Sequence, residues 1–285
     1  MEVIIGKNAG FCYGVKRAVD GAKQECEKEK NIYCLGDIVH NQHVIDDLKE
    51  KGITFIENID EAKGTTIIRA HGVSKDIYEK AKNKNIELID LTCPSVLKIH
   101  KIAQEYSEKG YYILLTGKEK HPEIIGIESH CGNKYKIIKD KEYLLNVIEE
   151  VKDEENILLI SQTTFNSKKF DEIAEILKSK INSNLEIKKT ICPSTEIKQK
   201  ETEEIAKNVD VMIIIGDKKS SNTTKLFEIS KKYCEKVIFL EDSNELSRES
   251  IKDAKKIGIM AGASTPIEQI EIVKGRLLWK KIIPE

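Results

Sequence analysis

Residues 86–94 read Ile86-Glu87-Leu88-Ile89-Asp90-Leu91-Thr92-Cys93-Pro94, and this stretch decides the fold. Its apolar residues predict a short buried strand, and the proline after the cysteine suits the first turn of a helix. The stretch 185–189 leads to Cys192-Pro193 in the same way, and a strand at 3–5 precedes Cys12. A strand that delivers a cysteine to the start of a helix therefore occurs three times.

Each of these cysteines is followed by matching residues at a spacing that does not vary. A glycine comes first, at the end of a predicted strand; a His or Ser follows it, and a further polar side chain comes third. In chain order these are Gly36, Gly117 and Gly216, then His40, His121 and Ser220, then Gln42, Glu123 and Asn222. Such spacing indicates an internal threefold repeat.

Apolar runs that predict buried strands alternate with amphipathic helical stretches along the whole chain. Besides the three strands above, we predict strands at 32–35, 66–68, 112–115, 157–160, 211–215, 237–240 and 257–260. This alternation predicts an α/β fold with mostly parallel sheets. We expect three similar α/β units, which we call repeats, at 1–92, 93–190 and 191–285, around a pseudo-threefold axis. Ligands bind beyond the carboxyl ends of parallel strands, so the loops there are expected to face one central site.

Composition excludes several classes of protein. The 285 residues carry a net charge of −1, which excludes a polybasic nucleic-acid binder. No apolar run approaches the roughly 20 residues that span a bilayer. The start Met1-Glu2 lacks the positive charge of a signal peptide, so we expect a cytoplasmic protein with no membrane or nucleic-acid partner. Only four of the 47 basic residues are arginines, which disfavours an arginine clamp for a phosphate.

The three repeated cysteines are candidate ligands of a metal or iron–sulfur cluster. The chain has seven cysteines and no C-x-x-C pair, so ligands have to come from distant segments. A 4Fe–4S cluster usually takes four cysteines, and three would leave one iron open. A helix N-terminus favours the thiolate, which is the ligating form. We assign Cys12, Cys93 and Cys192 to the metal, and Cys26, Cys34, Cys131 and Cys234 to packing.

Polar side chains gather in the loops at the predicted strand ends. They are His40, His71, His121, Thr163, Ser220, Ser221, Asn222 and Ser264. Hydroxyl, amide and imidazole groups at helix starts suit a diphosphate, although Ser220 and Ser221 could equally cap a helix. Glu123 is a candidate proton donor or a solvated residue. A cluster-bearing redox sensor and a zinc enzyme acting on a phosphorylated substrate remain alternatives at this point.

The motifs together resemble the 4-hydroxy-3-methylbut-2-enyl diphosphate reductase family over nearly the whole chain. The matching segments are Phe11-Cys12-Tyr13-Gly14-Val15-Lys16-Arg17-Ala18, Val39-His40-Asn41, Arg69-Ala70-His71-Gly72-Val73, Leu91-Thr92-Cys93-Pro94, His121-Pro122-Glu123, Ser161-Gln162-Thr163-Thr164, Thr190-Ile191-Cys192, Ser220-Ser221-Asn222 and Gly262-Ala263-Ser264. The resemblance implies an oxidoreductase that catalyses the last step of the methylerythritol phosphate route to isoprenoids. It removes the allylic hydroxyl of the substrate with two electrons and two protons, giving isopentenyl and dimethylallyl diphosphates.

The resemblance also implies roles for individual residues. The three motif cysteines would hold one 4Fe–4S cluster whose fourth iron is open to substrate, and the motif histidines and serines with Asn222 would bind the diphosphate. Glu123 would deliver protons, and Thr163 would contact the substrate hydroxyl or Glu123. A ferredoxin or flavodoxin is the implied electron donor. Where the family commonly has alanine and later an Arg-Gln pair, this chain has Ser194 and Lys198-Gln199, and we expect no appended S1-type RNA-binding domain.

Overall fold

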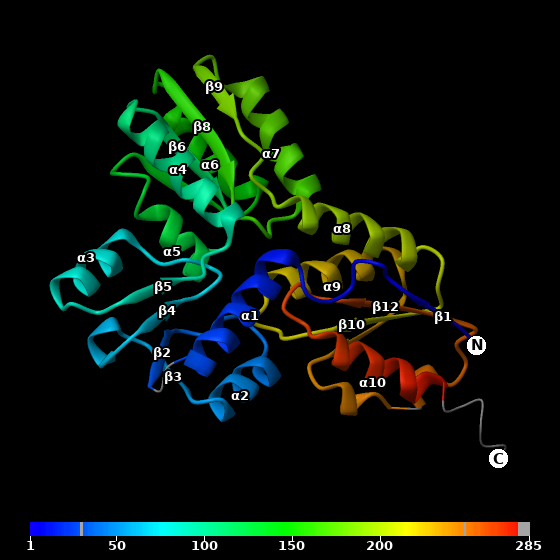
Figure 1. Cartoon of the computed structure of the whole chain (residues 1–285). Coiled ribbons are helices and arrows are strands. Elements are labelled where there is room, and N and C mark those ends of the chain that lie inside the picture. The colour runs from blue at the N-terminus through cyan, green and yellow to red at the C-terminus, as the bar shows by residue number, and fades with distance from the viewer. Residues whose placement is uncertain (29–30, 248, 279–285) are drawn as a thin grey trace. The chain divides into compact units, whose positions relative to one another are not determined.

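The computed structural model describes residues 1–28, 31–247 and 249–278 (Figure 1). The described residues form twelve strands in three four-stranded sheets, and every strand pair is parallel. The predicted fold class, three similar α/β units with parallel sheets, is therefore confirmed. The last residues of the third predicted repeat, 279–285, lie outside the described residues.

The three sheets share one strand order. In spatial order they are β3 (Ile53–Ile56), β2 (Ile32–Leu35), β4 (Thr66–Ile68) and β5 (Leu88–Asp90); β7 (Tyr135–Ile138), β6 (Tyr112–Thr116), β8 (Asn156–Ser161) and β9 (Asn184–Ile187); and β11 (Lys236–Leu240), β10 (Val211–Ile215), β12 (Lys256–Ala261) and β1 (Glu2–Ile5). The third sheet thus takes its last strand from the N-terminus, with Ile5 opposite Ile259. The boundaries 1–92, 93–190 and 191–285 stay a prediction.

Helices connect the strands, as parallel pairing requires. They are α1 (Tyr13–Lys28), α2 (Gln42–Glu50), α3 (Lys75–Asn83), α4 (Pro94–Glu108), α5 (Pro122–Glu128), α6 (Lys141–Val151), α7 (Ser167–Lys180), α8 (Pro193–Ala206), α9 (Ser221–Tyr233) and α10 (Ile267–Leu278). Three short 3₁₀ helices lie at Ile59–Glu61, Ser243–Glu245 and Glu249–Ile251. Helices α1, α4 and α8 each begin directly after a motif cysteine, as the sequence predicts.

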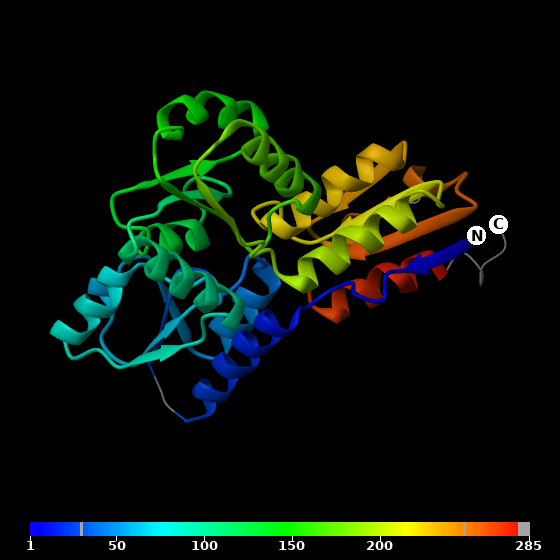
Figure 2. The ribbon, with the colours of Figure 1, turned by 90° about the horizontal axis from the view of Figure 1, so that it is seen from above.

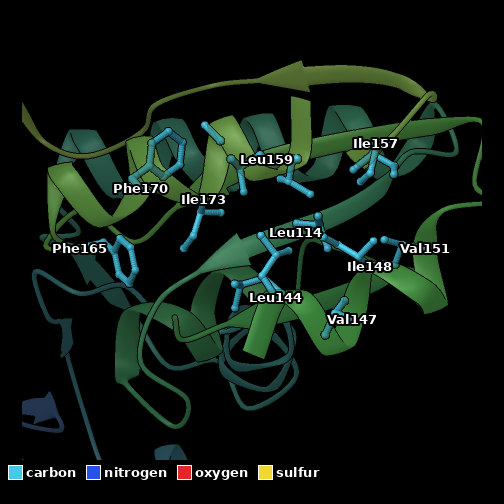
Figure 3. Packing of buried hydrophobic residues seen from close by; sticks show 14 of the residues in the cluster. Leu114, Leu144, Val147, Ile148, Val151, Ile157, Leu159, Phe165, Phe170 and Ile173 are labelled. Carbon is cyan, nitrogen blue, oxygen red and sulfur yellow. The ribbon is translucent and has the colours of Figure 1, made fainter. Parts of the chain in front are cut away.

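Apolar residues on both faces of each central strand bury the sheets between helices. In β6, Leu114 packs with α6 and α7 on one face (Figure 3), whereas Ile113 and Leu115 pack with α4 and α5 on the other. Alternate residues of β10 divide in the same way between α10 and the pair α8 and α9. The ribbons of these helices around their sheet are shown in Figure 2. Successive strand side chains point to opposite faces, so the continuous apolar runs produce these three-layer cores.

Two strands, β3 and β7, are absent from the sequence prediction. Both are edge strands, and both mix polar with apolar residues, as in Ile53-Thr54-Phe55-Ile56. An edge strand needs fewer apolar residues than a central one, so the apolar run that marks a buried strand is missing. The threefold repeat could have predicted β3 and β7, because the equivalent edge strand of the third sheet, β11, is apolar enough to be predicted from its own sequence.

The described chain divides into two compact bodies. The first body comprises residues 1–16, 40–44 and those from 193 onward, and the second comprises 17–39 and 45–192. The first body holds the sheet of β1, β10, β11 and β12, and the second holds the other two sheets. Across the described ranges, none of the helices combines the length and apolarity needed to cross a bilayer.

Candidate active site

The three motif cysteines share one backbone arrangement. The amide N–H of each cysteine donates to a carbonyl in the loop that follows one strand of each sheet, namely β12, β4 or β8. These bonds join Cys12 N to Ala263 O at 3.2 Å, Cys93 N to Ala70 O at 3.0 Å, and Cys192 N to Thr163 O at 3.0 Å. The first bond lies in the first body and the other two lie in the second. Each cysteine is therefore tied to the neighbouring motif loop, which carries Ser264, His71 or Thr163.

The cysteines fall into two chemical groups. Cys12, Cys93 and Cys192 are half-buried at helix starts, and all seven cysteines are reduced thiols. The other four each donate the thiol to a backbone carbonyl; these bonds run from Cys26 to Ala22, Cys34 to Gly36, Cys131 to Ile127 and Cys234 to Lys236. Burial raises the pKa of Cys34 and of Cys131 to about 12. Thiols that already donate to a backbone carbonyl are poorly placed to bind a metal, so the donor set that fits a cluster is the three motif cysteines.

Two of these cysteines lie near each other in the second body. The hydroxyl of Ser95, two residues after Cys93, donates to the sulfur of Cys192 at 3.9 Å. The start of α4 therefore contacts the loop that leads into α8. This proximity is what a shared cluster requires of two of its ligands.

Glu123 is a buried acid held by one neighbour. It is 2% exposed, and its two carboxylate oxygens accept the N–H of Thr163 at 2.6 Å and the hydroxyl of Thr163 at 2.7 Å. Burial raises the pKa of Glu123 to about 7, although the two hydrogen bonds from Thr163 oppose this shift. An acid with a pKa near neutrality can hold a proton and release it under physiological conditions.

The two motif histidines of the second body lie side by side. The rings of His71 and His121 meet edge to face, with centroids 5.5 Å apart. The Nδ1 atom of His121 accepts the N–H of Glu123 at 3.1 Å, so this histidine also caps α5. Because Nδ1 is the acceptor, the ring proton of His121 sits on Nε2, where it can be donated.

The first body places its motif residues around the start of α9. The hydroxyl of Ser220 accepts the N–H of Thr223 and caps the helix, which begins at Ser221. The hydroxyl of Ser264 donates to the carbonyl of His40 at 2.8 Å, which joins two predicted binding loops. Some of the serine hydroxyls therefore cap or tie loops in addition to any role toward a ligand.

Asn222 carries a clear sign of an external partner. Its side chain is buried, and neither its amide nitrogen nor its oxygen has a hydrogen-bond partner among the described residues. Glycines line the same region: a Cβ on Gly262 or Gly216 would collide with Thr223. Buried amide groups are nearly always hydrogen-bonded. The side chain of Asn222 thus fits a polar ligand such as a diphosphate oxygen.

The comparisons with known proteins agree with this geometry. A model of the LytB protein family matches residues 3–278. The chain belongs to the LytB protein family. A relative from Caldanaerobacter subterraneus subsp. tengcongensis is 42% identical over 96% of this chain and 98% of its own, and one from Clostridioides difficile is 42% identical over the same shares. Both are named 4-hydroxy-3-methylbut-2-enyl diphosphate reductase.

Solved structures give the same family relationship. This LytB chain resembles a structure titled (E)-4-hydroxy-3-methyl-but-2-enyl diphosphate reductase, the terminal enzyme of the non-mevalonate pathway, with 36% identity, a TM-score of 0.71, and coverage of 98% of this chain and 100% of the other. It also resembles the E-1-hydroxy-2-methyl-but-2-enyl-4-diphosphate reductase from Plasmodium falciparum, with 29% identity, a TM-score of 0.90, and coverage of 97% and 88%.

Some residues of this LytB chain have roles that sequence reasoning missed. Lys198, noted only as a departure from the family pattern, is 2% exposed and donates to backbone carbonyls before Cys12. Gln162 joins two motif loops, because it accepts the N–H of Lys118 at 3.1 Å and donates to Thr164 at 3.0 Å. No sequence signal marks Lys198 as buried, because the buried stripe of α8 on which it lies, between Thr195 and Thr202, is polar there.

Proposed function

We propose that this chain reduces 4-hydroxy-3-methylbut-2-enyl diphosphate, as its relatives are named to do. The reaction breaks the bond between the allylic carbon and its hydroxyl. Two electrons and two protons enter, and water leaves with formation of isopentenyl or dimethylallyl diphosphate. Membership of the LytB family and the names of the curated relatives support this activity.

The cluster is proposed to be one 4Fe–4S group held by Cys12, Cys93 and Cys192. When bound, the cluster would supply the electrons and a Lewis-acid iron. That iron would be open to the substrate because the three cysteines ligate only three of the four irons. The observation that carries this assignment is the shared backbone arrangement of the three cysteines, together with the neutral state of the buried thiols. The same observation disfavours a zinc site that draws on the other cysteines.

The diphosphate is proposed to bind the polar loops at the strand ends. The residues are His40, His71, His121, Ser220, Ser221, Asn222 and Ser264. The amide of Asn222, which is buried and has no partner among the described residues, would donate to a phosphate oxygen. Imidazole N–H groups supply hydrogen-bond donors in a chain that has few arginines. A redox sensor or electron carrier has no use for such an amide, which favours the enzyme over that alternative.

Glu123 is proposed to deliver protons, with Thr163 as its positioning and relay partner. The protonated carboxyl is the acid, and the hydroxyl of Thr163 lies 2.7 Å from one carboxylate oxygen. The hydrogen bond from the N–H of Thr163 fixes the rotamer of the carboxyl. Because Glu123 is buried, protons pass to the substrate without bulk water in the site.

The electron donor stays a prediction that comes from the family resemblance, and the compartment stays a prediction that comes from the residue composition of the sequence. We propose a ferredoxin or flavodoxin as the donor and the cytoplasm as the location. Reduction of the purified protein by each donor, followed by electron paramagnetic resonance, distinguishes the two donors.

Iron and sulfide analysis of anaerobically purified protein tests the cluster assignment. We expect a brown protein with about four irons per chain. Turnover is then measured with the diphosphate substrate and a chemical reductant. A colourless protein that contains zinc, or an iron protein with no turnover of this substrate, would overturn the proposal.

A further inference from the structure

The segment before Cys12 is held by two oppositely charged side chains of α8. The ammonium group of Lys198 donates to the carbonyls of Asn8 and Gly10, the latter at 2.7 Å. The carboxylate of Glu201, on the same helix, accepts the N–H of Lys7 at 2.6 Å and the N–H of Asn8 at 3.0 Å. The helix that begins after Cys192 therefore fixes the backbone that leads to Cys12.

A buried lysine needs a reason, because desolvation of an ammonium group is costly unless it is paired. Lys198 is 2% exposed, and both of its bonds go to backbone carbonyls of one loop. The carbonyls of this loop cannot pair in a sheet, since β1 ends at Ile5. Lys198 thus supplies donors that the local backbone lacks.

A second contact of the same kind precedes Cys93. The guanidinium of Arg17, on α1, donates to the carbonyl of Thr92 at 3.1 Å and to that of Leu91 at 3.4 Å. These are the two residues directly before the cysteine. The helix that begins after Cys12 therefore fixes the backbone that leads to Cys93.

The third contact reaches the sulfur itself. The hydroxyl of Ser95, in the first turn of α4, donates to the sulfur of Cys192 at 3.9 Å. The helix that begins after Cys93 thus contacts Cys192. The three contacts form a closed cycle along the chain, and each lies within one of the two bodies.

We infer that Lys198, Arg17 and Ser95 are positioning residues, through which the helix after each cluster cysteine holds the next cysteine of the cycle. This inference rests on the proposed role of the three cysteines as ligands. A cluster fixes the distances between its ligand sulfurs, so loops that are already ordered lose less conformational entropy when they bind it. Each helix begins directly after one motif cysteine and makes a contact that holds a different motif cysteine.

Site-resolved alkylation of the full-length chain tests the cycle. The variants are Lys198→Met, Arg17→Met and Ser95→Ala, with Lys207→Met as the matched control because Lys207 pairs only with Glu203 among the described ion pairs. After removal of iron by a chelator, each chain is treated with iodoacetamide, and modification of each cysteine is followed by mass spectrometry.

We expect each variant to raise the rate constant for alkylation of the thiolate of its own cysteine, obtained from rates measured at several pH values, by roughly five- to tenfold, the effect of one or two lost hydrogen bonds. Lys198→Met acts on Cys12, Arg17→Met on Cys93 and Ser95→Ala on Cys192, and the other two rates stay within about twofold. Lys198→Arg should restore the Cys12 rate, since a guanidinium also donates to two carbonyls. Iron release from the loaded variants to the chelator should be faster to the same degree.

Equal increases at all three cysteines, or no increase in any variant, would overturn the cycle. If Lys198→Met fails to fold, Ser95→Ala decides, because it removes a single hydroxyl. Failure of the proposed function has a different signature: a wild-type chain that binds no iron refutes the cluster, whereas the alkylation pattern still reports whether these contacts hold the cysteines.

Discussion

Replacement of Glu123 by glutamine removes an acid while preserving the shape of the site. The side-chain oxygen of Gln can still accept the N–H of Thr163, and its NH₂ group can donate to the hydroxyl of Thr163 once that hydroxyl rotates. We expect an unchanged iron content, a substrate affinity near that of wild type, and turnover reduced by roughly 10²–10⁴-fold, the usual contribution of a positioned acid.

The pKa of Glu123 predicts how the wild-type rate depends on pH. A pKa of about 7 means that the protonated acid is lost as the pH rises above neutrality. The wild-type rate should therefore fall about tenfold for each further pH unit, and the Glu123→Gln variant should lack this decline. Steady-state rates with a chemical reductant, measured from pH 6 to pH 9 beside the iron content, provide the data. Turnover of the variant within a few-fold of wild type would refute the assignment.

The same substitution predicts a change in stability with a definite sign. The folded protein keeps its proton up to about pH 7, whereas the unfolded chain releases it near the ordinary value of 4.5. The stabilisation of the folded state that comes from this raised pKa is therefore fully present below about pH 4.5, and it is lost as the pH rises through about 7. Glu123→Gln should unfold like wild type at pH 4 but be more stable at pH 8, by up to about 3 kcal/mol. Urea unfolding at the two pH values measures this difference.

Three further predictions concern other parts of the molecule. Serine at Cys93 should lower the iron content sharply, whereas Cys26→Ser should leave it unchanged, and full cluster occupancy in the first variant would refute the ligand assignment. Ser264→Ala should weaken substrate binding by about 1 kcal/mol in calorimetric titration, with the cluster absorption retained, and an unchanged affinity would place the diphosphate elsewhere. His100 and His130 stack with ring centroids 4.5 Å apart, and burial lowers the pKa of each to about 4. Because their unfolded pKa lies near 6.5, the free energy of unfolding should fall as the pH drops from about 6.5 to 4, by up to about 3 kcal/mol for the buried His100. Chemical unfolding at several pH values should show a weaker pH dependence in His100→Phe, and identical pH profiles would contradict this account.

The sequence predicted the architecture because the fold repeats itself. The intervals between a cysteine, a glycine and a histidine or serine are the same in all three repeats even where the surrounding residues differ, so the three parallel sheets followed from spacing and strand pattern. The edge strands β3 and β7 did not follow, since their sequences mix polar and apolar residues.

Contacts between distant side chains did not follow from the residue pattern. Only the family resemblance implied a contact of Thr163 with Glu123, 40 residues away, and nothing implied the bond from Lys198 to Gly10, which spans 188 residues. Nothing in local periodicity records such a contact, and a lysine on a helix is ordinarily solvated. The burial of Lys198 comes from tertiary packing, which the pattern of residue types does not encode.

The third matching position after each motif cysteine illustrates how the repeats have diverged in chemistry. It holds Gln42 in the first repeat, Glu123 in the second and Asn222 in the third. A carboxylate at all three positions would repel an anionic diphosphate, whereas amides can donate to it. The single acid is also the one whose burial raises its pKa to about 7, so near neutrality about half of it is uncharged and adds less repulsion. If the proposed site binds a diphosphate and donates protons, one buried acid with neutral residues at the two equivalent positions is the arrangement that serves both tasks.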